Sequence, residues 1–315
     1  MNLFSEVSTA FPKETPVVRY LATRFTYFDY DKWLVRIAEG KIQCNGFAAL
    51  AGDTVSPGDI VSYDAGEFEE PAADLSYRIA WEDPWFLCID KPGNLLVHRA
   101  GISFHNNLTH LLRHVHVPAF PTAHPVHRLD RETSGALIVA KTLEVRIALG
   151  REFDAGRVEK WYYAIVHGIA PTGPIELPIG KLVDSSIPYK FGVIGTGKAC
   201  RTNVIASEPL SGEYSLVTLK PLTGRTHQIR VHLAAIGHPV VGDKLYGQSE
   251  AGYLAWRDDK THGADPLWFP RQALHCATLA FMHPYAKERC TVEVPMREDM
   301  QGLIETLRAG IAPLR

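Results

Sequence analysis

Residues 127–135 read His-Arg-Leu-Asp-Arg-Glu-Thr-Ser-Gly, and the apolar run Ala136–Ala140 follows directly. A short apolar run bounded by polar residues is typical of a strand that is buried in a sheet. A carboxylate in a loop that leads into such a strand stands on a rigid platform, as a nucleophile or base requires. Asp130 is therefore the first candidate for catalysis, and an aspartate that only caps a turn is the structural alternative.

Around this segment, strands and helices follow one another without a regular strand–helix–strand repeat. Trp85–Asp90, Lys160–His167 and Ser215–Leu219 have the composition of strands. Glu144–Phe153 and Thr226–Ile236 have the apolar spacing of helices. This order favours an α+β fold over a doubly wound α/β sheet.

The N-terminal quarter of the chain has its own pattern. We expect residues 1–16 to be irregular and residues 17–66 to form a small α+β module. Residues 59–83 contain eight acids and one base, which indicates a linker or a solvated face. We place an acidic linker at 67–76 and the main domain at 77–315.

Composition excludes several classes of protein. A formal net charge of -2 over 315 residues excludes a basic nucleic-acid coat, so positive charge must be gathered locally if the chain binds RNA. No apolar run approaches the ~20 residues of a membrane span, and the N-terminus lacks a secretory pattern. Scattered cysteines without a C-x-x-C pair indicate reduced thiols in a cytoplasmic protein. They are Cys44, Cys88, Cys200, Cys276 and Cys290.

A second segment gathers positive charge. From Lys220 to His232 there are three lysines or arginines and no acid, at the start of an expected helix. Because a helix N-terminus is itself electropositive, this segment suits a phosphate or a carboxylate that must stay ionised. A solvated helix face is the alternative.

A third segment, Lys160-Trp161-Tyr162-Tyr163, combines a cation with aromatic rings. On a strand, Lys160 and Tyr162 share one face. An aromatic ring beside a cation is suited to stacking on a nucleobase. Packing of these rings in the core is the commoner role of such a strand.

Histidines are concentrated in one region. Six lie between His105 and His127, and three of them form an H-x-x-x-H-x-H pattern at His110, His114 and His116. No H-E-x-x-H motif is present and no cysteine or acid completes a tetrahedral set, so we expect no metal site.

Together these segments resemble the RluA-type RNA pseudouridine synthases. The signature H-R-L-D-x-x-T-S-G with a following A-K matches at residues 127–141. The later block matches from Gly224 to Leu233 and on through Gly242-Asp243 to Tyr246-Gly247. The K-x-Y and L-H elements fall at Lys160-x-Tyr162 and Leu274-His275, so the resemblance covers roughly residues 77–295 in order.

The resemblance implies a catalytic domain with a mixed, largely antiparallel sheet and flanking helices and loops. Residues 17–64 resemble the small RNA-binding module that is often fused to these enzymes. The chain departs from the family at Asn94 and Arg99, where glycine and proline are usual, and at Cys276, which replaces an alanine. Asn94 tolerates a left-handed backbone better than most residues, so we expect the turn to be kept.

The resemblance also implies an activity, the isomerisation of uridine to pseudouridine in structured RNA, either ribosomal or transfer RNA. Asp130 would be the catalytic carboxylate, attacking C1′ or removing a C2′ proton. Arg225 would hold it ionised, Tyr162 would stack on the uracil and serve as a possible acid or base, and Arg128 would fill the space of the flipped base. The further residues expected to bind RNA are His127, Arg131, Lys160 and Arg230.

The implied enzyme needs no cofactor, nucleotide or metal, since the uracil is retained, and we expect a monomer without a membrane partner. Two other functions fit parts of the pattern. One is an RNA-binding or RNA-folding protein whose catalysis is dispensable. The other is a nucleoside or glycoside hydrolase, which generally pairs two carboxylates; Glu132 is the acid that lies close to Asp130 in sequence.

Overall fold

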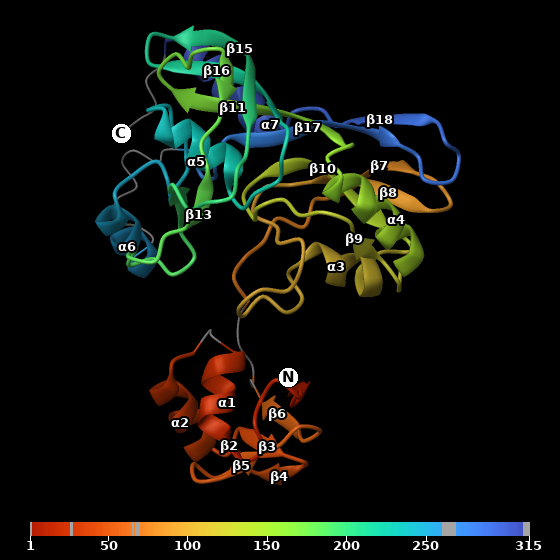
Figure 1. Cartoon of the computed structure of the whole chain (residues 1–315), viewed down its shortest axis with the longest axis vertical. Helices are drawn as coiled ribbons and strands as arrows, with labels where there is room; N and C mark the ends of the chain where they lie inside the picture. Colours follow the sequence, from red (N-terminus) through yellow and green to blue (C-terminus); the bar gives the residue numbers. More distant parts are fainter. Residues whose placement is uncertain (1, 26–27, 65, 67–69, 260–268, 311–315) are drawn as a thin grey trace. The chain divides into compact units, whose positions relative to one another are not determined.

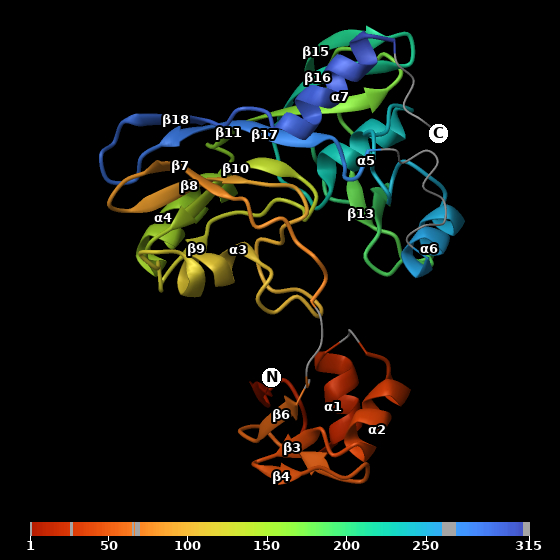
Figure 2. The same cartoon turned by 180° about the vertical axis from the view of Figure 1, so that it is seen from behind.

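The computed structural model describes residues 2–25, 28–64, 66, 70–259 and 269–310. The chain divides into two compact units, shown in Figures 1 and 2. The first comprises Met1–Ala72 with Arg99–Asn106, and the second comprises Ala73–His98 with Asn107–Arg315. The division after Ala72 falls within the linker predicted at 67–76.

The first unit packs two helices, α1 (Val17–Arg24) and α2 (Tyr30–Ala38), over a small sheet. Trp33 and Tyr20 are buried at its centre because an amphipathic helix turns its apolar face to the sheet. The sheet order is β1 (Asn2–Glu6), β6 (Ile60–Asp64), β3 (Ile42–Cys44), β4 (Phe47–Ala48), and β2 (Thr15–Pro16) pairs separately with β5 (Thr54–Val55).

Two expectations for this part of the chain differ from the structure. Residues 1–16 are not irregular throughout, because β1 pairs antiparallel with β6, a partner far along the chain that no local pattern reveals. Arg99–Asn106, predicted within the domain 77–315, groups with the first unit. The carboxylate of Glu70 accepts hydrogen bonds from the backbone N–H groups of His105 and Asn106, which holds the segment there.

In the second unit, ten strands of the described residues form one sheet. β10 and β17 pair in parallel, and the other strand pairs of this sheet that the described residues form are antiparallel. This confirms the predicted α+β class with a mixed, largely antiparallel sheet. Across the sheet the order is β12 (Gly173–Ile175), β15 (Thr202–Ser211), β16 (Tyr214–Pro221), β11 (Glu159–His167), β17 (Leu274–Met282), β10 (Ser134–Ala140), β8 (Phe86–Lys91) and β7 (Arg78–Glu82). β18 (Arg289–Glu293) pairs with β17, and β9 (His124–Pro125) with β10.

The central strands of this sheet are covered on both faces. β8 and β10 are buried at every residue, as expected for continuous apolar strands in a sheet with two covered faces. α4 (Leu143–Asp154) lies in front of the sheet in Figure 1, and α7 (Glu298–Arg308) lies in front of it in Figure 2. The remaining elements are α3 (Leu108–His110), a π-helical turn (Leu111–Val115), the hairpin β13 (Ile179–Lys181) and β14 (Phe191–Val193), α5 (Gln228–Ala235) and α6 (Glu250–Asp258).

Among the described residues, no helix has both the length and the apolar composition that crossing a lipid bilayer requires.

Candidate active site

The loop of residues 127–133, which we call the 127–133 loop, is fixed where it enters β10. The N–H of Thr133 donates to the carbonyl of Asp130 at 3.1 Å, which closes a tight turn. Gly135 has a φ of 109°, and a Cβ there would lie 2.1 Å from the carbonyl oxygen of Cys276 on β17. Only glycine permits this approach, so the glycine of the signature holds the loop against the parallel strand and makes Asp130 part of a rigid frame.

A turn at residues 91–95 also holds the 127–133 loop, through hydrogen bonds to Arg131. The buried ammonium of Lys91 donates to the carbonyls of Pro92, Leu95 and Arg131. Asn94 adopts the expected left-handed conformation, with a φ of 55°, and its side-chain oxygen accepts from Nε of Arg131 at 2.8 Å. The Arg131 side chain therefore bonds within the protein, and it is absent from the described lining of the cavity. Its RNA-binding role stays a prediction.

Asp130 opens into a cavity of about 550 Å³. Its walls come from the 127–133 loop, the C-terminal end of α4, β11 and the segment 221–230. Segments far apart in the sequence thus bring together seven of the eight predicted site residues: His127, Arg128, Asp130, Lys160, Tyr162, Arg225 and Arg230.

The arginine that pairs with Asp130 is Arg230, not Arg225 as predicted. Nη1 of Arg230 lies 2.8 Å from Oδ2 of Asp130. Nε and Nη2 of the same guanidinium bind Oδ2 and Oδ1 of Asp243 at 2.6 and 2.8 Å. Arg225 is exposed at the cavity, and its backbone N–H donates to Gln228. Arg225 lies in the exposed loop before α5, whereas Arg230 lies within α5 and is buried. The Arg230 guanidinium is engaged in these ion pairs, and its contact with RNA stays a prediction.

Charge balance keeps Asp130 ionised. Burial alone would raise the pKa of this carboxyl, but Arg230, His227 and Arg128 outweigh burial and hold it below its ordinary value. Arg230 stays cationic, because Asp243 and Asp130 together raise its pKa despite burial. Asp130 is thus a carboxylate at neutral pH.

Two further residues belong to the surroundings of Asp130: His227, and Tyr246 behind it in contact with His227. The sequence alone did not assign them a role. His227 lines the cavity with a φ of 56°, an uncommon backbone conformation for a residue other than glycine. Its Nδ1 lies 2.9 Å from the hydroxyl of Tyr246, and its Nε2 lies 3.8 Å from Oδ1 of Asp130. Burial lowers the pKa of His227 to about 4, so the ring is neutral at pH 7. Both residues stand inside the matched motif, which was the available signal.

Tyr162 is part of the cavity wall. It lies on β11, where it is cross-strand partner to Cys276 of β17, so the family departure at 276 falls directly beside this ring. Burial raises the pKa of the Tyr162 phenol well above its ordinary value, and that of the Cys276 thiol to about 12. Both groups are un-ionised at neutral pH. Lys160, on the same face of β11, donates to the carbonyl of Thr223 at 3.3 Å.

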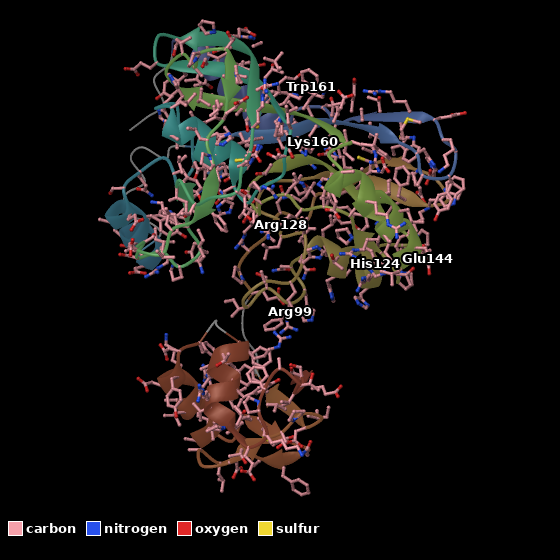
Figure 3. The ribbon with its side chains drawn as sticks, viewed as in Figure 1. Arg99, His124, Arg128, Glu144, Lys160 and Trp161 are labelled. Atoms are coloured by element: carbon pink, nitrogen blue, oxygen red, sulfur yellow. The ribbon has the colours of Figure 1, made fainter. Side chains whose placement is uncertain are left out.

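His127 and Arg128 differ sharply although they are adjacent. Nε2 of His127 accepts the N–H of Ile138 at 3.1 Å, and the ring stacks on Phe153 at 4.6 Å. Burial lowers the pKa of His127 to about 3, so it is a neutral support for β10. The side chain of Arg128 is exposed and makes no hydrogen bond or ion pair with any residue that the structure describes. Figure 3 marks Arg128 and, on β11, Lys160.

The structure also bears on the hydrolase and metal-site alternatives. Glu132, the acid on which a hydrolase would depend, is paired with Lys244 at 3.0 Å and does not line the cavity as described. The rings of His110 and His114 lie 4.9 Å apart, as expected for one helix face. In the described part of the chain, no three His, Cys, Asp or Glu side chains are grouped as a metal ion would need.

Comparisons with known proteins identify relatives of this chain. Residues 85–235 match the family model of the RNA pseudouridylate synthases. Ribosomal large subunit pseudouridine synthase D of Nitrosomonas europaea is 34% identical over 275 residues, covering 85% of this chain and 77% of that protein. The protein of the same name from Xanthomonas campestris pv. campestris is 35% identical over 298 residues, covering 93% and 88%. Among solved structures, human RNA Pseudouridylate Synthase Domain Containing 1 is similar with a TM-score of 0.56 and 27% identity, covering 76% of this chain and 98% of that one.

Proposed function

This chain belongs to the RNA pseudouridylate synthase family and is an RNA pseudouridine synthase, and from that premise we propose its substrate and its catalytic residue. The enzyme converts specific uridines of large-subunit ribosomal RNA to pseudouridine, with Asp130 as the catalytic carboxylate. The relatives at 34% and 35% identity are both named for the large ribosomal subunit, which supports ribosomal RNA over transfer RNA.

The observation that carries this proposal is the state of Asp130. Its carboxylate is partly buried in the cavity wall and ionised, and one oxygen, Oδ2, is held by Arg230. Within the described residues, Oδ1 accepts no hydrogen bond and stays available to a bound substrate. A fixed, charged and partly desolvated oxygen is what attack at C1′ or removal of a C2′ proton requires.

The reaction conserves all atoms of the nucleotide. The bond between N1 and C1′ breaks, the bond between C5 and C1′ forms, and the proton lost from C5 is balanced by one gained at N1. The uracil must leave its stack to reach Asp130, at a cost of a few kcal/mol. Arg128 supports this step, because its exposed guanidinium at the cavity is free of ion pairs with the described residues and can occupy the vacated space.

The ring of Tyr162 supports binding of the detached uracil. It lies in the wall of the same cavity as Asp130 and presents an apolar face on which a base can stack. Because its phenol is un-ionised, it serves as a stacking surface or proton donor in the resting enzyme and not as a phenolate base.

Replacement of Asp130 by Asn tests the proposal. This change keeps the shape of the side chain and removes the charge, so pseudouridine formation should fall by about 10⁴-fold or more, as for loss of a nucleophile elsewhere. Binding of RNA and the thermal midpoint should change little. Asp154→Asn is the matched control, because Asp154 is an exposed carboxylate of the same cavity wall, and it should keep near wild-type activity.

Activity near wild type in Asp130→Asn contradicts the catalytic role, and equal losses in both variants indicate a hydrolase-like carboxylate pair instead. Release of free uracil from the wild-type reaction would support the same alternative. The RNA target is tested by pseudouridine mapping in cells with and without the gene. Loss of a large-subunit ribosomal site is the expected result, and loss of a transfer RNA site alone would replace the proposed substrate.

A further inference from the structure

The segment from Gly242 to Gly247, here the 242–247 turn, does not line the cavity as described, yet it contacts two groups beside Asp130. We propose that this turn is a positioning element for catalysis: Asp243 orients Arg230, and Tyr246 orients His227, so that one oxygen of Asp130 stays free for the substrate. The inference rests on the proposed catalytic role of Asp130.

The first argument is the geometry of the Arg230 guanidinium. Nε and Nη2 of Arg230 donate to the two carboxylate oxygens of Asp243 at 2.6 and 2.8 Å, and Asp243 is completely buried. Arg230 therefore reaches Asp130 with Nη1 alone, at Oδ2. An unrestrained arginine prefers to bind a carboxylate with two parallel N–H groups. Without Asp243, the guanidinium can rotate so that two of its N–H groups bind both oxygens of Asp130. Oδ1, the oxygen proposed to act on the substrate, would then be occupied.

Asp243 can hold this orientation because the turn fixes it in place. Its Oδ1 also accepts the backbone N–H groups of Leu245 and Tyr246, both at 3.0 Å. Gly242 has a φ of 74°, and a Cβ there would lie 2.1 Å from the carbonyl oxygen of Arg271. A Cβ at Gly247 would lie 2.5 Å from the carbonyl oxygen of Asp243. The two glycines thus let the chain close tightly around the carboxylate.

The second argument is the arrangement of Tyr246. Its hydroxyl oxygen accepts the N–H of Phe191 at 3.3 Å, so its own proton is directed to Nδ1 of His227 at 2.9 Å. This places the ring proton of the neutral His227 on Nε2, the nitrogen that faces Oδ1 of Asp130 at 3.8 Å. At that distance the N–H does not bind the carboxylate, and an oxygen of the substrate can accept it.

Replacement of Asp243 by Asn tests the first half. Asn keeps an oxygen for the two backbone N–H groups and loses the charge and the second acceptor for Arg230. The kcat should fall by about 100-fold, as for a small misplacement of a reacting group, while KM and the Kd for RNA stay within about twofold. A smaller folded fraction would also lower the apparent kcat at constant KM, so kcat is calculated per folded enzyme and its loss must exceed the loss of folded protein measured by circular dichroism.

The chain offers a matched control in Asp299→Asn. Arg271 binds Asp299 with the same fork, at 2.6 and 2.8 Å, and Asp299 likewise accepts a backbone N–H, from Met300. Arg271 even touches the 127–133 loop through the carbonyl of Glu132, but it does not contact Asp130. This variant should lose stability and keep its kcat, measured for both variants well below their thermal midpoints. Equal kcat losses in the two variants would overturn the role of Asp243.

Replacement of Tyr246 by Phe tests the second half. The ring is kept, and only the hydroxyl that fixes His227 is lost, so kcat should fall by about tenfold with KM unchanged. This is less than the ~10²-fold low end for loss of a proton donor, because His227 itself remains. Wild-type kcat in Tyr246→Phe would overturn this half. Asp130→Asn is assayed alongside: if it is active, the proposed function fails, whereas an inactive Asp130→Asn with a fully active Asp243→Asn overturns the positioning element alone.

Discussion

The loop at 221–227 and the helix α5 that follows it are adjacent in sequence, yet their arginines have opposite surroundings. Arg225 of the loop is exposed at the cavity, and its side chain has no hydrogen bond or ion pair within the described structure. Arg230 of the helix is buried between Asp130 and Asp243. Both carry the same charge in one basic motif, so the difference shows that burial, not charge, selects the partner of the carboxylate.

Two residues at the junction create this difference. His227 has a left-handed backbone, which delays the start of the helix to Gln228 and sets its direction. The buried side chain of Gln228 then ties loop to helix, because its Oε1 accepts from Thr223 Oγ1 and from the N–H of Arg225. Its Nε2 donates to the carbonyl of Arg201 at 3.0 Å. The loop therefore keeps Arg225 exposed at the cavity, whereas the helix places the Arg230 side chain in the protein interior.

Replacement of Arg230 by Gln should have the largest effect of the changes in this segment. It removes the donor that holds Asp130, and kcat should fall by about 10²- to 10³-fold, as for loss of a preorganised charge donor. Burial, no longer opposed by Arg230, raises the pKa of Asp130. The acid limb of the pH–rate profile should therefore move to higher pH, since kcat follows the ionised carboxylate.

Arg230→Lys separates charge from geometry in the same experiment. Lysine keeps the positive charge beside Asp130, so the acid limb should return toward its wild-type position. It lacks the fork that Asp243 holds, so kcat should stay low. An acid limb that does not move in Arg230→Gln would contradict the view that Arg230 sets the ionisation of Asp130.

Replacement of Gln228 by Ala should have an intermediate effect, mainly on stability. The change leaves partly buried partners in the loop and on Arg201 without hydrogen bonds, at a cost of about 1 kcal/mol in the free energy of unfolding. Chemical denaturation measures this loss. Gln228→Glu is the comparison variant, because it keeps the acceptor for the loop but removes the donor to Arg201 and Thr202 and buries a carboxyl group. It should also lose stability, yet it should lose less affinity for RNA than Gln228→Ala. The reverse order would show that the loop does not depend on Gln228.

Replacement of Arg225 by Gln should have the smallest effect and should act on binding. An exposed arginine at the cavity can contact an RNA phosphate, so its loss should lower the slope of log Kd against log salt by about 1. The kcat at saturating RNA should stay near wild type. Arg151→Gln removes an equal exposed charge outside the described cavity lining and should leave Kd unchanged. If Arg225→Gln lost as much kcat as Arg230→Lys, Arg225 would be the partner of Asp130 once RNA is bound.

Local patterns in the sequence were sufficient for the main elements of the second unit. The helix expected at 144–153 is α4, and the strand expected at 160–167 is β11, because apolar periodicity and β-branched composition act within a few residues. The helix expected from Thr226 begins only at Gln228, because the left-handed conformation of His227 follows from tertiary contacts such as the bond to Tyr246. β1 was missed for a similar reason, since its partner β6 lies at the other end of the first unit.

By itself, the sequence determined the class of the fold, the family and the candidate carboxylate, because a contiguous motif such as 127–135 carries its glycine, its carboxylate and its strand together. Only the tertiary structure decided which arginine holds Asp130 and that Asp243, His227 and Tyr246 stand around it. Ion pairs form between side chains that the fold brings within 3 or 4 Å. Arg225 and Arg230 are only five residues apart, yet one lies in the loop before α5 and the other within the helix.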